Sequence, residues 1–443
     1  MRETVIQFGE GNFLRAFVNY FFDVMNKKGL YDGKAVVVQP LENGLVHLLN
    51  EQDGKYNLFL RGVENGEEVD EHILVESISR GINPYEDFDG FLALAENPDM
   101  RVVVSNTTEA GIEFIGTEKL EDRPAKAFPA KVTQLLKKRF DLGLKGFIFL
   151  PCELIDDNAV YLKKYVLQYA DLWNLGDAFK TWVEEENVFC NTLVDRITTG
   201  YPRDTLAEFE DRISGKDNLI DTAEAFYLWV IEGDHEKELP FREAGLNVVW
   251  TDDVKPYKKR KVRILNGGHT ALVCGALLYG IETVGEALAH ETVRPYLEHL
   301  MFEEIVPTLG NNPEDVQFAK DVLERFENPF VSHRLDSIVL NSVAKFETRV
   351  LPTILEHKET FGTYPEGLVM SLAALIAFYH TDQVKDMPEV VKFMKEASVE
   401  EVLAHEPYWL KDLSDLRPMV QEYYDIIMNE GMQAAYDAVL RRG

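Results

Sequence analysis

Hydrophobic residues follow two kinds of spacing in the first half of the chain. Short runs made mostly of apolar residues, typical of buried strands, occupy residues 4–8, 34–39, 101–105, 146–150 and 246–250. Between them, apolar residues recur with helical period from residue 13 onward, over 129–140 and over 157–182. Residues 56–61 and 68–78 alternate in part and predict an inserted strand pair. This succession of strands and helices predicts an α/β domain with a parallel sheet.

The second half of the chain shows a different pattern. Beyond Lys255 the apolar residues keep a helical period to Arg442, and we find no convincing strand run. The polar residues Thr251 to Asp253, followed by Pro256, are typical of a linker. We therefore expect an α/β N-terminal domain over residues 1–253 and an all-helical C-terminal domain over residues 254–443.

A glycine turn joins the first predicted strand to the first predicted helix. Its residues are Gly9, Glu10, Gly11 and Asn12, followed by Phe13. A strand, a Gly-x-Gly turn and a helix N-terminus form the phosphate cradle of nucleotide-binding βα units. The third glycine of that motif is replaced here, so a simple glycine turn of an α/β protein is the alternative.

The ends of two other predicted strands carry polar residues that bear on cofactor binding. Gln39 ends the second strand, where NAD-binding folds carry an acid and NADP-binding folds often an arginine, and the nearest carboxylate is that of Glu42. This position therefore does not separate NAD from NADP. Asn106, Thr107 and Glu109 follow the strand at 101–105 and lie either at a ligand-binding sheet edge or in a capped turn.

The segment KVRILNGGH carries three side chains suited to handling a proton and an alkoxide. Lys261, Asn266 and His269 stand at i, i+5 and i+8, so on an α-helix they would share a face only loosely. Lysine is an acid or base, and an asparagine amide donates to an oxyanion. Gly267 and Gly268 allow a ligand or a neighbouring backbone to come close. The alternative is a solvated lysine, a helix-capping asparagine and a packed histidine.

Asn191 lies in NTLVDRIT, a segment crowded with apolar residues. It is either a turn residue or a second amide donor. Cys152 follows a predicted strand without a histidine nearby in sequence, which favours a packed thiol over a nucleophile.

Charge excludes some classes of partner. The formal net charge is −30, whereas binding to nucleic acid or to an anionic membrane requires a basic face. The run KPYKKRKVR, which contains Arg260 and Arg263, resembles a nucleic-acid patch. Because the chain is so acidic and the run leads into Lys261, we expect it to attract an anionic substrate or cofactor.

Cysteine spacing and the N-terminus bear on location. The three cysteines are far apart with no CxxC pair, so we expect no disulfide and no metal site. The first residues lack the pattern of a secretory signal, and the longest apolar stretch, near 372–379, is too short to span a bilayer. We expect a cytoplasmic protein.

Four motifs occur in an order that identifies a family. FGEGNFLRAF, VVVSNTTEAG, NTLVDRIT and KVRILNGGH together resemble the mannitol dehydrogenase family of polyol-specific long-chain dehydrogenases, over nearly the whole chain. The resemblance implies a Rossmann-like domain that binds NAD, a helical C-terminal domain, an interdomain active site and no metal. It implies that hydride passes between the nicotinamide and a carbonyl carbon.

The resemblance also implies roles for individual residues. Lys261 would be the general acid/base, Asn191 and Asn266 the oxyanion-stabilising amides, and His269 a substrate-positioning group. Gly9 to Phe13 would hold the pyrophosphate of the cofactor. A nucleotide-binding sensor without chemistry is the alternative from another class, and the presence of all four polar side chains counts against it.

A second group of residues bears on the substrate. Lys345, in SVAKFETR, matches a substrate-contacting lysine of the family, with Asn341 one turn before it. At Ser337 the chain departs from polyol-oxidising members, which carry an arginine that binds substrate hydroxyls. Arg349, one helical turn after Lys345, is our candidate for binding the carboxylate of a small sugar acid. The alternative is that Arg349 pairs with a surface carboxylate.

Overall fold

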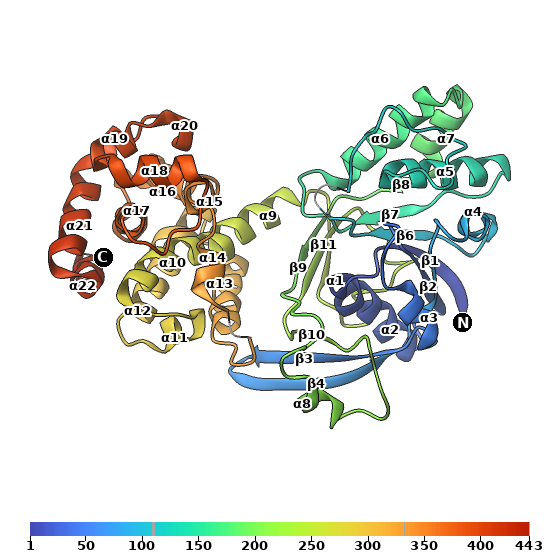
Figure 1. Cartoon of the computed structure of the whole chain (residues 1–443), viewed down its shortest axis with the longest axis horizontal. Coiled ribbons are helices and arrows are strands. Elements are labelled where there is room, and N and C mark those ends of the chain that lie inside the picture. Colours follow the sequence, from blue (N-terminus) through green and yellow to red (C-terminus); the bar gives the residue numbers. More distant parts are fainter. Residues whose placement is uncertain (109–110, 332, 443) are drawn as a thin grey trace. The chain divides into compact units, whose positions relative to one another are not determined.

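The computed structural model describes residues 1–108, 111–331 and 333–442. Glu109, one of the polar residues considered above, lies outside these ranges. The chain forms two compact units (Figure 1). Unit 1 contains residues 1–61 and 69–255, and unit 2 contains residues 62–68 and 256–443.

Unit 1 contains a parallel six-stranded sheet with the strand order β5-β2-β1-β6-β7-β8. The strands are β1 (Arg2–Phe8), β2 (Gly33–Val38), β5 (Ile78–Ile82), β6 (Val102–Ser105), β7 (Ile148–Pro151) and β8 (Val188–Phe189). The order reverses between β1 and β6. In open α/β sheets, ligands bind outside the carboxyl ends of the strands at such a switch point. The parallel sheet expected from the apolar runs is confirmed, and so is the Rossmann-like domain that the family resemblance implies.

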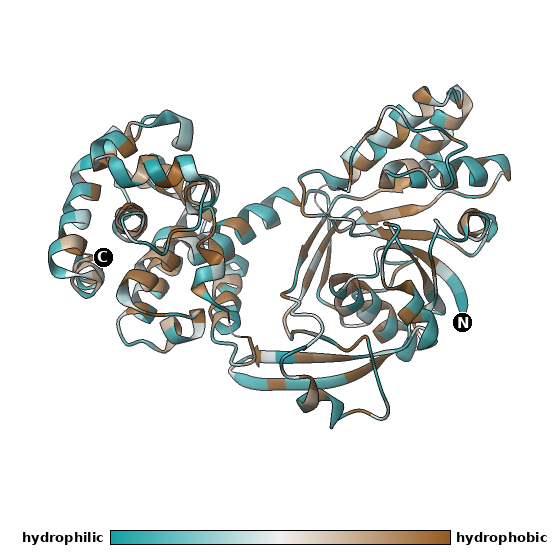
Figure 2. Cartoon of the chain, viewed as in Figure 1, coloured by the Kyte–Doolittle hydropathy of each residue, from teal (hydrophilic) through white to brown (hydrophobic). Residues whose placement is uncertain are grey.

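Helices cover both faces of this sheet because its buried strands point successive apolar side chains in opposite directions. Ile6 packs with the helices on one face and Val5 with those on the other. The first set is α4 (Phe88–Ala93), α5 (Phe128–Asp141), α6 (Asn158–Leu172) and α7 (Asp177–Glu186); the second is α1 (Asn12–Leu14), the π turn η1 (Arg15–Asn19) and α2 (Tyr20–Lys27). Short helices are α3 (Val46–Glu51), η2 (Leu94–Glu96) and α8 (Leu206–Glu210). Figure 2 shows the hydrophobic residues concentrated along the central strands.

Two three-stranded sheets complete unit 1, with strand orders β10-β3-β4 and β12-β11-β9. Their strands are β3 (Tyr56–Glu64), β4 (Glu67–Val75), β9 (Thr192–Asp195), β10 (Asp221–Glu224), β11 (Leu228–Glu232) and β12 (Val248–Thr251). The strand predicted at 68–78 was too long, since Ile78 begins β5 of the main sheet. We did not predict β10, whose buried residues are mostly polar, or β11, although its apolar run was a usable signal.

Unit 2 is helical, and in the part of it that the structure describes no strand follows residue 255. Its helices are α9 (Lys255–Lys261), η3 (Val262–Asn266), α10 (Gly267–Tyr279), α11 (Val284–Ala289), α12 (Val293–His299), η4 (Leu300–Ile305), η5 (Val306–Leu309), α13 (Pro313–Phe326), α14 (Leu335–Ile338), α15 (Ser342–Arg349), α16 (Leu351–Phe361), α17 (Glu366–Phe378), α18 (Pro388–Glu396), α19 (Val399–Leu403), α20 (Glu406–Trp409), η6 (Ser414–Leu416), α21 (Arg417–Glu430) and α22 (Met432–Arg442). The nearly all-apolar α17 is buried beyond its first residue and contacts α10 and α21, so it forms the centre of the unit. Among the described residues, no helix has the length and apolar character that crossing a membrane requires.

Candidate active site

The glycine turn lies at the switch point of the main sheet. Gly9 follows β1 with φ +117°, a conformation that favours glycine. A Cβ atom on Gly9 would lie 2.9 Å from the carbonyl oxygen of Asn106, just after β6. A Cβ on Gly11 would meet nothing within 4 Å, so the space beside this backbone is open. A tight turn next to open space at a helix N-terminus suits the close approach of a diphosphate.

The buried side chain of Arg15 fixes the shape of this turn through hydrogen bonds. Its side chain is only 1% exposed. Nε donates to the carbonyl of Glu10 at 3.3 Å, and Nη2 donates to Oδ1 of Asn12 at 2.5 Å. Phe13 stacks on Phe17 with ring centroids 5.0 Å apart. The side chains of Asn12 and Phe13 therefore contact other residues of the chain. The backbone amides of the glycine turn are the groups suited to a ligand.

Glu153 holds the loop after β6 and was not among the residues expected from the sequence. This buried carboxylate accepts hydrogen bonds from Ser105 Oγ at 3.0 Å, from Thr107 N at 2.9 Å and from Thr107 Oγ1 at 3.0 Å. Burial raises the pKa of Glu153, and these hydrogen bonds oppose the rise. The usable signal was an acid two residues after the end of β7.

The side-chain amide of Gln39 forms hydrogen bonds within the loop that follows β2. Its amide nitrogen donates to the carbonyls of Leu41 and Glu42, at 2.9 and 3.0 Å. Its oxygen accepts from the amide of Val46 at 3.4 Å. The side chain therefore shapes the turn after β2.

Asn191 is a buried residue between β8 and β9 with a fixed amide orientation. Oδ1 accepts from the amides of Ala159 and Val160, at 3.0 and 3.3 Å, at the start of α6. Nδ2 donates to Glu232 Oε2 at 2.8 Å. An amide nitrogen carries two hydrogens, so one donor remains for a ligand. The sequence did not point to Glu232, because it lies on the unpredicted strand β11.

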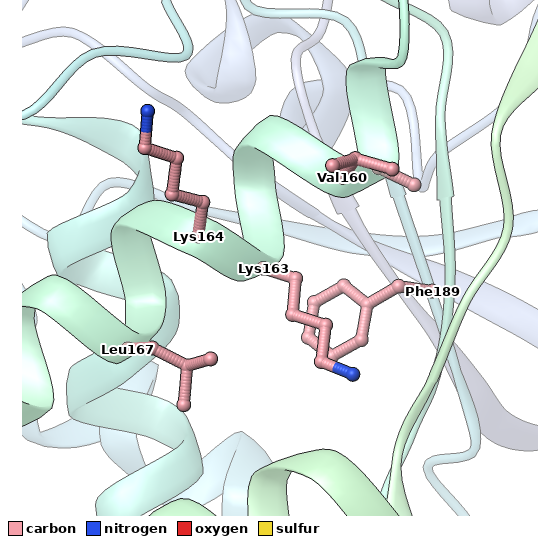
Figure 3. A pocket seen from close by; sticks show the side chains of 6 residues that line it. Val160, Lys163, Lys164, Leu167 and Phe189 are labelled. Atoms are coloured by element: carbon pink, nitrogen blue, oxygen red, sulfur yellow. The ribbon is translucent and has the colours of Figure 1, made fainter.

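A pocket of about 500 Å³ opens beside the same end of α6. Its lining includes Val160, Lys163, Leu167 and Phe189 (Figure 3). The ammonium of Lys163 lies 5.9 Å from the centre of the Phe189 ring, whereas Lys164 points away from that ring. None of the residues proposed from the sequence lines this pocket.

In unit 2, a π turn brings Lys261 and Asn266 to one face. Lys261 is the last residue of α9, and η3, a π-helical turn, follows it and ends at Asn266. A π turn is closed by i to i+5 hydrogen bonds, so residues five apart lie nearly one turn apart on the same side. The expectation of a loosely shared face, which assumed an α-helix, is corrected by this turn.

The two glycines after Asn266 allow close packing. A Cβ on Gly267 would lie 3.1 Å from the carbonyl oxygen of Arg349, and one on Gly268 would lie 2.8 Å from Cε of Met301. From the sequence, either a ligand or a neighbouring backbone was expected to come close to these glycines. The structure shows a neighbouring backbone at Gly267.

The arginines that flank Lys261 in sequence are both paired with carboxylates. Arg260 lies 3.6 Å from Asp315, and Arg263 lies 3.0 Å from Glu356. Their charges are thus partly neutralised within unit 2.

His269 is buried in α10 between two rings. It stacks on Phe326 at 4.0 Å and meets His333 edge-on at 4.8 Å. Its Nε2 has no hydrogen-bond partner within the described ranges. Burial lowers the pKa of His269 well below its ordinary value, and the charges of His333, Arg325, Arg349 and Lys345 lower it further.

Helix α15 carries the remaining candidates. Asn341 is the exposed residue before its first turn, at φ +52°. Lys345 Nζ donates to the carbonyl of Ile338 at 2.7 Å. Arg349 forms no ion pair with any carboxylate that the structure describes, and Asp336 pairs instead with Arg334 at 3.1 Å. The structure thus shows no surface pairing of Arg349 among the described residues, and carboxylate binding by Arg349 stays a prediction.

The sequence predicted neither a disulfide nor a metal site. Cys152, Cys190 and Cys274 are free and buried. Within the described ranges, no three His, Cys, Asp or Glu side chains are grouped so that they could hold a metal.

Both halves of the chain match known families and relatives. Residues 3–241 match the mannitol dehydrogenase Rossmann domain, and residues 253–427 match the mannitol dehydrogenase C-terminal domain. An altronate oxidoreductase of Bacillus subtilis is 43% identical, covering 100% of this chain and 96% of the relative. An altronate oxidoreductase of Bacteroides thetaiotaomicron is 45% identical, covering 99% and 97%.

Solved structures show the same fold. The substrate-free crystal structure of a D-sorbitol dehydrogenase has a TM-score of 0.85 at 22% identity, covering 98% of this chain and 95% of that one. The Pseudomonas fluorescens mannitol 2-dehydrogenase, a ternary complex with NAD and D-mannitol, has a TM-score of 0.74 at 21% identity, covering 100% and 95%. With domain matches over most of its length and full-length relatives above 40% identity, the chain belongs to the mannitol dehydrogenase family of oxidoreductases.

Proposed function

We propose that the protein catalyses the reversible, NAD-dependent reduction of the keto sugar acid D-tagaturonate to D-altronate. The observation that carries this proposal is the 43–45% identity, over the full length, to relatives named altronate oxidoreductase. We place the reaction in the cytoplasm, where buried free thiols such as Cys152 stay reduced.

The dinucleotide is bound by residues 1–253 in this proposal. The backbone of Gly9 to Phe13 surrounds the pyrophosphate, and Asn106 and Thr107 form the opposite rim. The open space beside Gly11 and the tight packing of Gly9 fit such a ligand. When bound, NAD supplies or accepts the hydride.

Residues 254–443, together with Asn191, act on the substrate. During reduction, the ammonium of Lys261 gives its proton to the carbonyl oxygen as hydride reaches the carbonyl carbon. The amides of Asn191 and Asn266 donate to the oxygen while negative charge builds there. During oxidation, the neutral amine of Lys261 takes the hydroxyl proton back, and His269 positions the substrate in both directions.

The substrate's other end is held by α15. We propose that Lys345 and Asn341 contact its hydroxyls and that Arg349 binds its carboxylate. A guanidinium matches a carboxylate with two parallel hydrogen bonds, and Arg349 forms no ion pair within the described part of the chain. Ser337, where polyol-oxidising members of the family carry arginine, fits a substrate held by a different anchor.

Oxidation of NADH with D-tagaturonate, D-fructuronate and D-fructose in parallel tests the proposal, with the Lys261→Ala variant as the control for contaminating reductases. We expect the highest kcat/KM with D-tagaturonate. A preference for D-fructuronate or D-fructose would support a fructuronate reductase or a mannitol 2-dehydrogenase instead. NADH binding without turnover of any substrate would support a nucleotide-binding sensor.

A further inference from the structure

Unit 2 gathers five basic side chains, here called the basic cluster: His269, Arg325, His333, Lys345 and Arg349. They come from α10, from the end of α13 and the segment after it, and from α15. The ring contacts of His269 with Phe326 and His333 join the first three segments. The positive charges that lower the pKa of His269 belong to the other four members.

Four of the five members of the basic cluster have no carboxylate as an ion-pair partner. In the described part of the chain, no carboxylate forms an ion pair with His269, His333, Lys345 or Arg349. The charge of Asp386 acts on Lys345, and this carboxylate accepts hydrogen bonds from the hydroxyl of Tyr379 and from the amide of Met387. In a chain of net charge −30, the grouping of these four basic side chains without an ion-paired acid among the described residues indicates a site for an anion.

His269 gives a second, independent indication of a ligand. It is only 9% exposed, and its Nε2 has no hydrogen-bond partner among the described residues. Buried polar atoms in folded proteins almost always have a partner. A ligand oxygen would supply the missing one.

We infer, on the basis of the proposed function, that the basic cluster recognises the carboxylate of the sugar acid and that Arg325 and His333 help to determine this specificity. Arg349 binds the carboxylate directly, and His333 donates a second hydrogen bond. Arg325, 6% exposed, adds positive charge that acts on His333 and His269. An uncharged ketose gains nothing from these groups.

The cluster also couples binding to protonation. Burial lowers the pKa of His333, and Arg325 lowers it further. A bound carboxylate offsets the surrounding cations, so the pKa values of His269 and His333 rise in the complex. Sugar-acid binding should therefore take up protons and weaken as pH rises, whereas binding of an uncharged ketose should not depend on pH in this way.

The test compares KM for D-tagaturonate with KM for D-tagatose, the uncharged ketose, in the variants His333→Gln and Arg325→Gln. We expect KM for D-tagaturonate to rise about tenfold or more, with kcat/KM for D-tagatose within about twofold of wild type. Arg334→Gln is the matched control, because Arg334 is exposed and pairs with Asp336. Its constants should equal those of wild type.

Two further measurements keep the inference testable. Because Arg325 is buried, thermal unfolding confirms that its variants fold, and Arg325→Lys should recover most of the affinity. Calorimetric titration of the NADH complex with D-altronate, in buffers of different ionisation enthalpy, should show proton uptake in wild type and less in His333→Gln.

The inference is overturned if both glutamine variants keep the wild-type KM for D-tagaturonate, or if KM for both substrates rises equally. Failure of the proposed function looks different, because wild type would then reduce no sugar acid. In that case the D-altronate titration decides: binding that the His333→Gln substitution weakens supports an acid-binding cluster, and the absence of binding rejects it.

Discussion

Lys261 is the residue whose loss should reduce turnover most. Lys261→Ala removes the proton donor, so we expect kcat to fall by roughly 10²-fold or more. NADH binding should persist, because the glycine turn belongs to a different unit. Stopped-flow turnover and fluorescence titration with NADH measure the two effects. Lys259→Ala is the control, since Lys259 lies in the same helix and pairs with Glu356 at 3.0 Å. Near-wild-type turnover in Lys261→Ala would remove this lysine from the mechanism.

Arg349 should govern affinity for the acid. Arg349→Leu removes a charge-assisted contact worth roughly 1.5 to 3 kcal/mol, so KM for D-tagaturonate should rise about 10- to 150-fold. The constant for NADH should stay unchanged. Steady-state kinetics with each reactant varied in turn measures both. An unaltered KM for D-tagaturonate, or equal activity of wild type with D-fructose, would contradict the carboxylate anchor.

At the scale of single residues, local spacing in the sequence predicted which site residues share an element. It did not predict partners that lie far apart in the sequence. The motif placed Lys261, Asn266 and His269 within one helical segment, and the structure confirms that placement. Glu232, which orients Asn191, lies 41 residues further along the chain. No spacing rule connects the two, because their contact depends on how β11 pairs with β9.

The glycine turn is the element whose geometry is easiest to test. Gly9→Ala forces alanine into a left-handed conformation and against the Asn106 carbonyl. It should lower the free energy of unfolding by roughly 1 to 3 kcal/mol. Gly11→Ala meets no neighbour, so stability should change by less than about 0.5 kcal/mol. Its methyl group should still weaken NADH binding by roughly tenfold. Urea unfolding measures the stability of both variants, and NADH titration measures their affinity for the cofactor. Equal stability losses in the two variants would contradict the tight packing assigned to Gly9 and the open space assigned to Gly11.

Strand β10 should make stability depend on pH through Asp221. Burial raises the pKa of this carboxyl to about 7, although Arg15 and Arg196 oppose the rise. An unfolded Asp titrates near 3.9, so the folded protein binds this proton more tightly. The contribution of Asp221 to stability therefore falls as pH rises from about 4 to about 7.

Asp221→Asn removes this titration. Relative to wild type, the variant should gain roughly 2 kcal/mol more stability at pH 8 than at pH 5, as measured by urea unfolding at both pH values. Asp177→Asn is an exposed control that should show no such difference. The same gain at both pH values would argue against a buried ionised carboxylate.

Elements were predictable where their apolar pattern was pure. The strands β2, β6 and β7 are almost wholly buried and each contains at least three consecutive apolar residues, and in β1 only Gln7 interrupts the apolar run from Val5 to Phe8. Strand β10 is equally buried but consists of Asp, Thr, Ala and Glu, so hydropathy carried no signal there. The π turn η3 was also missed, because apolar periodicity does not separate one π turn from the α-helix around it.

The molecule as a whole should keep its activity without added metal. Its cysteine and histidine spacing offers no zinc-ligand pattern. We expect full turnover after exhaustive dialysis against a chelator, with a zinc-dependent alcohol dehydrogenase treated in parallel as the positive control. Loss of activity that zinc restores would contradict this prediction.

At the largest scale, the division into an α/β half and a helical half followed from where strand patterns stop. The helical character of unit 2 was predictable because helix periodicity is a local property. The basic cluster was not, since α10, α13 and α15 meet only in the folded unit and their contacts have no fixed spacing in sequence.

The π turn at η3 has a consequence for chain length. Such a turn contains one residue more than the α-helical turn that would fill the same stretch. A deletion of one residue within the first four positions of this turn would allow a continuous α-helix to form. Lys261 and Asn266 would then stand four residues apart, roughly 40° around the helix axis, and would still share a face. The extra residue of the π turn therefore keeps the acid and the amide donor on one face at a spacing that an α-helix would not allow.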